Sequence, residues 1–136
     1  MRAVAATAFT AAGLSLAACG DGGVTAPTNA GICWHMARPQ GQPPRFNQLS
    51  TGVTSIEQCA GNLEAMRMRF RGMGLTQEEM VGAYQGQFLF LRSSGVWVGP
   101  SLEARPYLAL VRTGDGRLAT IGAVRRPPGV PAAPGP

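Results

Sequence analysis

A run of apolar residues with the period of an α-helix is the feature that most constrains the fold of this chain. From residue 56 to residue 73 the apolar side chains recur at spacings of 3, 4, 3, 4 and 3, which places them on one helix face. They are Ile56, Cys59, Leu63, Met66, Phe70 and Met73. Thr54 and Glu57 have the form of a capping box that starts the helix, and Gly72 and Gly74 predict its end. A helix with one apolar face needs a second layer to cover that face.

Short runs of aromatic and branched residues predict that layer as a β-sheet. Strands are expected at 31–36, 46–49, 84–92, 96–98, 107–113 and 117–121, with a proline-rich loop at 38–45. Thr76 and Glu79 repeat the capping-box form, which predicts a short second helix ending near Ala83. The sequence therefore predicts an α+β fold, in which a small antiparallel meander sheet carries one amphipathic helix on a face.

The 136 residues are enough for one domain, which we place at 31–123. Residues 124–136 are rich in proline and glycine and predict a disordered tail. All 12 basic residues are arginine, and the formal net charge is +5. The charge is modest and scattered, so the sequence does not indicate a nucleic-acid partner.

The N-terminal segment has the pattern of a cleaved secretory signal. Arg2 is followed by an uncharged stretch, 3–18, with small residues at its end. This stretch is short for a membrane span, which needs about 20 apolar residues. We therefore predict a signal peptide at 1–18.

The end of that segment, Leu16-Ala17-Ala18-Cys19, resembles the lipobox of bacterial lipoproteins. The resemblance implies that Cys19 becomes the first residue of the mature protein and carries a diacylglycerol and an acylated amine. Gly20 rather than aspartate follows the cysteine, which in Gram-negative lipoproteins favours the periplasmic face of the outer membrane. Residues 19–30 are then expected to be a flexible tether between the lipid and the domain.

Two further cysteines, Cys33 and Cys59, remain after Cys19 is assigned to lipid. An even pair in an exported, oxidising compartment predicts a disulfide from the first strand to the helix. The alternative is two unpaired buried thiols.

The sequence offers little support for an enzyme. His35 is the only histidine, so no second imidazole could complete a triad or a metal site. Cys33 and His35 share a strand face, and a Cys–His nucleophile pair stays open only if Cys33 is a free thiol. His35 with Met36 is a weak copper site. We expect no catalytic residues, no metal and no cofactor.

Two surfaces remain as candidates for recognition. Arg67, Arg69 and Arg71 form a basic cluster near the end of the helix, unless they are only a solvated helix end that suits the dipole. Glu64 lies three residues before Arg67 and predicts a helix-surface ion pair.

The second candidate surface is the strongly apolar hairpin, with three aromatic residues, Phe88, Phe90 and Trp97. It is either core or an open sheet face for a partner.

The function expected from these features is that of a non-catalytic envelope lipoprotein. Its lipid-anchored periplasmic domain would bind another envelope protein in an accessory or assembly role. The alternative is a module that binds an anionic lipid or a cell-wall fragment through the basic helix end and the aromatic residues of the sheet.

Overall fold

The computed structural model describes residues 23–75, 77–115 and 117–121. The predicted signal peptide, Cys19 and the predicted tail lie outside these residues. The elements are β1 (Cys33–Ala37), β2 (Arg45–Ser50), α1 (Ile56–Gly72), β3 (Met80–Tyr84), β4 (Gln87–Arg92), β5 (Gly95–Gly99), β6 (Tyr107–Arg112) and β7 (Leu118–Thr120).

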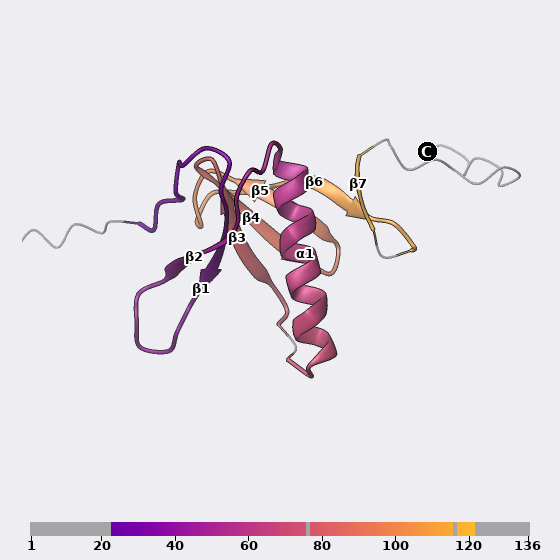
Figure 1. Ribbon diagram of the computed structural model, residues 1–136, viewed down its shortest axis with the longest axis horizontal. Helices are drawn as coiled ribbons and strands as arrows, with labels where there is room; N and C mark the ends of the chain where they lie inside the picture. The colour runs from indigo at the N-terminus through magenta and orange to yellow at the C-terminus, as the bar shows by residue number, and fades with distance from the viewer. Residues whose placement is uncertain (1–22, 76, 116, 122–136) are drawn as a thin grey trace, which may run out of the picture.

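The strands form one antiparallel sheet in the order β2-β1-β3-β4-β5-β6-β7. From β3 onward each strand pairs with the next one in the chain, so this part is a meander. Strand β2 lies at one edge of the sheet and pairs with one side of β1. After β2 the chain forms α1 and then β3, which pairs with the opposite side of β1. Figure 1 shows the single helix α1 lying alongside the strands. The predicted α+β fold, with one helix on an antiparallel sheet, is confirmed.

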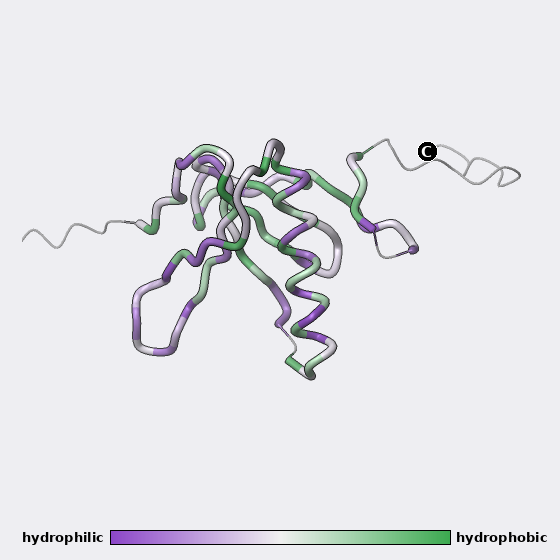
Figure 2. Tube along the Cα trace, viewed as in Figure 1, coloured by the Kyte–Doolittle hydropathy of each residue, from purple (hydrophilic) through white to green (hydrophobic). Residues whose placement is uncertain are grey.

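The face of the sheet beneath α1 holds the larger core cluster. Buried helix residues Cys59, Ala60 and Leu63 meet buried strand residues that alternate along β3 to β6. These strand residues are Met80, Tyr84, Leu89, Leu91, Val96, Val98 and Leu110. Figure 2 shows the central strands mostly in green, whereas the loop between β1 and β2 is mostly purple to white and α1 alternates between the two colours. The amphipathic pattern in the sequence is thus explained by burial of one helix face on the sheet.

The opposite face of the sheet carries a second, smaller core. Its buried members are Ala26, Met36, Val81, Ala83, Phe88 and Phe90, with Val24, Trp34, Phe46, Trp97 and Leu102 packed against them. Val24 and Ala26 come from the segment before β1. A hydrogen bond of 2.8 Å from the Gly86 amide to the Pro27 carbonyl holds this segment in place. Residues 24–27, which we expected to be part of a flexible tether, instead lie against the sheet.

The predicted second helix is wrong, because Met80–Tyr84 forms the central strand β3. All five residues of β3 are buried, as expected for a strand with a packed layer on each face. Gly82 is required there, because a Cβ would lie 2.7 Å from the backbone oxygen of Trp34 and 2.3 Å from Leu63 Cδ1. The turn from β3 to β4 uses Gln85 and Gly86, both with positive φ, which suits a tight two-residue hairpin.

The ends of α1 are set by local hydrogen bonds. Ser55, not Thr54, is the N-cap, and its hydroxyl accepts from the Gln58 amide at 3.1 Å. The Gln58 side chain in turn accepts from the Thr54 amide at 3.0 Å, so the capping box lies one residue later than predicted. At the other end Gly74 has φ +78, and the Leu75 amide donates to the Phe70 carbonyl at 2.9 Å. This is a Schellman motif, in which glycine adopts the left-handed conformation.

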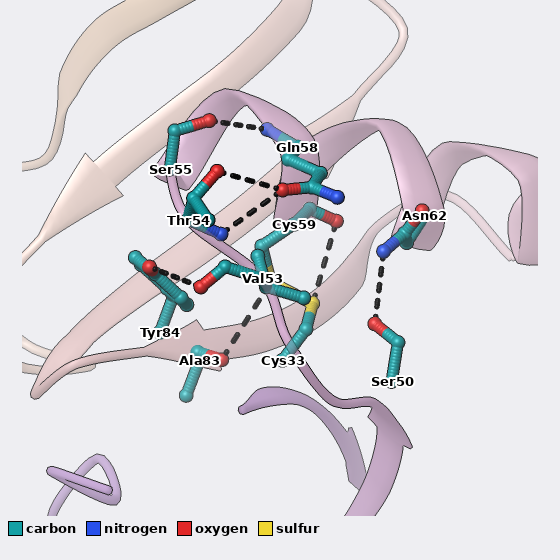
Figure 3. The surroundings of a disulfide bond; sticks show 10 residues. All are labelled: Cys33, Ser50, Val53, Thr54, Ser55, Gln58, Cys59, Asn62, Ala83 and Tyr84. Carbon is teal, nitrogen blue, oxygen red and sulfur yellow. Dashed lines mark hydrogen bonds between the residues drawn. A yellow bond between two sulfur atoms is a disulfide. The ribbon is translucent and has the colours of Figure 1, made fainter. Parts of the chain in front are cut away.

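The disulfide between Cys33 and Cys59 is present, as predicted. Its two Cα atoms lie 5.3 Å apart, within the usual range for this bond. Figure 3 shows it between β1 and the first turns of α1, beside the hydrogen bond from the Tyr84 hydroxyl to the Val53 carbonyl. The bond therefore fixes the start of the helix to the sheet.

Candidate functional site

A buried carboxylate with two arginines lies between α1 and strand β6 of the sheet. Arg112 donates to both oxygens of Glu64, with Nη2 at 3.0 Å from Oε2 and Nη1 close to Oε1. Arg67 Nη1 lies 3.3 Å from Glu64 Oε1. The side chains of Glu64 and Arg67 are each only 9% exposed. The predicted pair between Glu64 and Arg67 is thus present, but it is buried rather than on the surface.

Backbone contacts fix the position of Arg112. Its Nε and Nη2 donate to the Arg92 carbonyl at 3.1 and 2.8 Å, where β4 ends. The guanidinium of Arg112 therefore joins α1, β4 and β6 through one planar group. A bidentate pair of this kind is strong and geometrically specific.

Arg67 forms fewer contacts than Arg112, since Glu64 is its one hydrogen-bond partner among the described residues. Among the residues that the structure describes, its Nε has no hydrogen-bond partner, although this atom is buried. The side chain lines a cavity of ≈ 460 Å³ together with Arg71, Gln77, Glu78 and Ser93. We call this the Arg67 cavity. A smaller cavity of ≈ 220 Å³ shares Arg67, Arg71 and Ser93 and reaches Glu64 and Arg112.

The basic cluster seen in the sequence is divided by the helix. Arg67 and Arg71 are one turn apart and share a face, and both line the Arg67 cavity. Arg69 points away from them and lines a different hollow with Leu49 and Asn62. Arg69 and Arg71 are exposed, whereas Arg67 is buried. The three arginines therefore do not form one surface.

The aromatic residues of the hairpin do not form an open surface either. Phe88 is fully buried and Phe90 nearly so, and their rings lie 6.3 Å apart in the second core. Trp97 is half-buried, and its indole donates to the Ser94 hydroxyl at 3.2 Å. The arrangement matches the alternative that this hairpin is core.

His35 lies on the helix side of β1, with its ring edge toward Phe70 at a centroid distance of 6.4 Å. Burial lowers the pKa of His35 below its ordinary value, and Nδ1 is buried without a partner among the described residues. Cys33 is oxidised, so the Cys–His nucleophile pair does not exist in this structure. Met36 belongs to the opposite face of the sheet, so His35 and Met36 cannot share a copper ion. Within residues 23–75, 77–115 and 117–121 no three potential ligands of the His, Cys, Asp and Glu types come together.

An exposed apolar group at the end of α1 was missed in the sequence. Met68, Met73 and Leu75 are 53%, 63% and 56% exposed, and we call these residues the helix-exit patch. Met73 was expected to extend the buried helix face, but it is the C-cap and points to solvent because the helix has ended. The flanking Gly72 and Gly74 already indicated in the sequence that the helix ends at Met73. Figure 2 shows hydrophobic colour at this turn, below the hydrophilic positions of the helix.

Within the described part of the chain, no helix combines the length and the apolar character needed to cross a membrane. Comparison of the chain with protein families, with curated proteins and with solved structures finds no match.

Proposed function

We propose that this chain is a non-catalytic lipoprotein of the bacterial envelope, anchored by lipid on Cys19 and working by binding another envelope protein. The signal-like segment and the residues Leu16-Ala17-Ala18-Cys19 support the anchor. The disulfide between Cys33 and Cys59 supports an oxidising compartment, because such bonds persist outside the cytosol. The outer membrane is the proposed location because glycine rather than aspartate follows Cys19.

The observation that carries the binding role is the helix-exit patch. Three large apolar side chains, each more than half exposed, lie within eight residues of one another at the end of α1. Exposed Met and Leu side chains adapt to a partner surface and lose unfavourable contact with water when covered. Arg71, which is exposed and lines a cavity together with Met68, favours a partner with an apolar pocket and an acidic rim.

Site-specific photo-crosslinking in the producing bacterium tests the binding role. A photoreactive amino acid at Leu75 is expected to yield one adduct with an envelope protein. The same group at Gln42, exposed in the loop between β1 and β2, serves as the matched control and is expected to yield none. Met73→Asp should reduce the Leu75 adduct severalfold at an unchanged level of protein. Equal adducts from both positions, or an adduct insensitive to Met73→Asp, would refute the proposed surface.

The anchor is tested separately by intact mass of protein extracted from membranes. The expected mass is that of residues 19–136 plus a lipid adduct, with two alkylatable thiols appearing only after reduction. A mass without lipid would remove the anchor from the proposal and leave the helix-exit patch untouched. Density separation of the two membranes then tests the outer-membrane location.

A further inference from the structure

The Arg67 cavity contains a buried cation whose donors are largely unused. A guanidinium carries five N–H donors, and Arg67 gives one of them to Glu64 at 3.3 Å. Its Nε is buried without a partner among the described residues, and the residue is only 7% exposed. A buried guanidinium with so few acceptors is unfavourable, so an anion in the cavity that Arg67 lines would stabilise its charge.

Glu64 does not supply the missing acceptor. Its Oε1 accepts from Arg67 Nη1 and from Arg112, and its Oε2 accepts from Arg112, so one carboxylate is shared by two arginines while Arg67 Nε has no partner among the described residues. The neighbourhood holds three arginines, Arg67, Arg71 and Arg112, against two carboxylates, Glu64 and Glu78. A positive charge therefore remains unpaired next to the cavity, and a single anionic group would balance it.

We propose that the Arg67 cavity binds the phosphate group of a phosphate ester. The donors come from two elements, with Arg67 and Arg71 on one face of α1 and Ser93 on the turn between β4 and β5. A tetrahedral phosphate presents oxygens to all three, whereas a planar carboxylate presents only two. Arginine is also the residue best suited to bidentate phosphate contacts.

The remaining lining residues indicate what the phosphate is attached to. The volume of ≈ 460 Å³ exceeds that of a phosphate group alone. Gln77 and Glu78 line the same cavity and offer hydrogen-bond acceptors for hydroxyl groups. The cavity thus fits a hydroxylated phosphate ester such as glycerol phosphate, either free or as the headgroup of a phospholipid. Met68 of the helix-exit patch lines the adjoining smaller cavity, but no residue of that patch lines the Arg67 cavity itself, so the phosphate site is tested separately from the partner binding proposed above.

Nitrogen-detected NMR of the arginine side chains gives a direct test. The probe is glycerol 3-phosphate added to the ¹⁵N-labelled full chain, with its disulfide intact, in an uncharged detergent. Binding is expected to shift the Nε–Hε resonance of Arg67 in a saturable manner. Acetate at the same concentration should shift it much less. Vesicles with and without phosphatidylglycerol, assayed by co-sedimentation, distinguish a lipid headgroup from a free ester.

Two exposed arginines on the same helix provide the matched variants. Arg71→Gln removes a donor from the cavity and is expected to weaken binding about tenfold or more, the loss typical of one charge-assisted hydrogen bond. Arg69→Gln removes the same charge outside the cavity and should leave the affinity within about twofold. Ser93→Ala should weaken binding severalfold. Unchanged urea midpoints show that these exposed substitutions leave the fold intact.

The outcomes are distinct. Binding of the free ester, or of phosphatidylglycerol vesicles alone, supports the site provided that Arg71→Gln abolishes most of it and Arg69→Gln does not. Binding of the free ester indicates a soluble ligand, whereas binding of the vesicles alone indicates a lipid headgroup. Equal losses in the two variants would identify general charge attraction and overturn the site. No shift of Arg67 together with no vesicle binding would also overturn it.

Discussion

Removing the bond between Cys33 and Cys59 is expected to lower the free energy of unfolding by about 3.5 kcal/mol. The bond links residues that are 26 positions apart. In the chain-entropy model a loop of this length restricts the unfolded chain by about 12 cal/mol/K, or about 3.5 kcal/mol at 25 °C. Both cysteines are fully buried, so Cys33→Ala with Cys59→Ala also leaves small voids, which can only add to the loss. Domains of this size are stable by about 5–15 kcal/mol, so the change is a large share of the total.

Urea denaturation followed by tryptophan fluorescence measures this loss, because Trp34 adjoins Cys33 in β1 and is half-buried. The wild-type protein should lose a comparable amount of stability when a reductant is added. The double variant should be insensitive to the reductant, which makes it the control for unrelated effects. The slope of the transition should rise when the bond is absent, because the unfolded chain becomes more expanded.

A loss below about 1 kcal/mol would refute this reasoning. It would mean that the unfolded chain keeps β1 and α1 close together without the bond. A double variant that still responds to reductant would show that the effect does not arise from this pair.

Four other substitutions test the packing around the helix and the burial of His35. Tyr84→Phe removes the hydroxyl that donates to the Val53 carbonyl at 2.9 Å and should cost about 1 kcal/mol in urea denaturation; no change would mean that water replaces the bond. Gly82→Ala places a methyl 2.7 Å from a backbone oxygen of β1 and should lower the free energy of unfolding by about 1–3 kcal/mol or more, measured by thermal melting. Gly61→Ala is the matched control, because its methyl meets nothing within 4 Å, and it should raise the free energy of unfolding by up to about 1 kcal/mol. Burial lowers the pKa of His35, so the unfolded chain binds more protons than the folded one, and stability should fall as the pH drops below about 6.5. His35→Gln should flatten the stability between pH 7 and 5.5, and an unchanged slope would contradict the assignment.

The helix could be predicted because its signal is local and repeated. The apolar spacing from Ile56 to Phe70 needs no knowledge of the rest of the chain, and the structure buries that face. The second helix was predicted from an equally local signal, the capping-box form at Thr76–Glu79. That signal was overridden because Met80–Tyr84 fills the centre of the sheet between β1 and β4. Such a preference for the strand arises from neighbours distant in sequence.

The sequence already contained part of the information that separates buried Arg67 from the other arginines of the basic cluster. Arg67 follows Leu63 by four residues and precedes Phe70 by three, so the helical period already places it toward the buried face. The partner of Glu64 was not available, because Arg112 lies 48 residues away on another element. Burial of Phe88 and Phe90 had a signal in the unbroken apolar run of β4, which is typical of a strand covered on both faces.

The segment that seats Val24 and Ala26 against the sheet restricts how far the domain can move from its lipid. Five residue steps separate Cys19 from Val24, and they span at most about 17 Å when fully extended. With lipid on Cys19, as we propose, the segment between the lipid and Val24 is therefore short, and it joins the domain on the sheet face opposite α1. Such an anchor would hold the domain close to the bilayer, and a partner protein would meet it at the membrane surface.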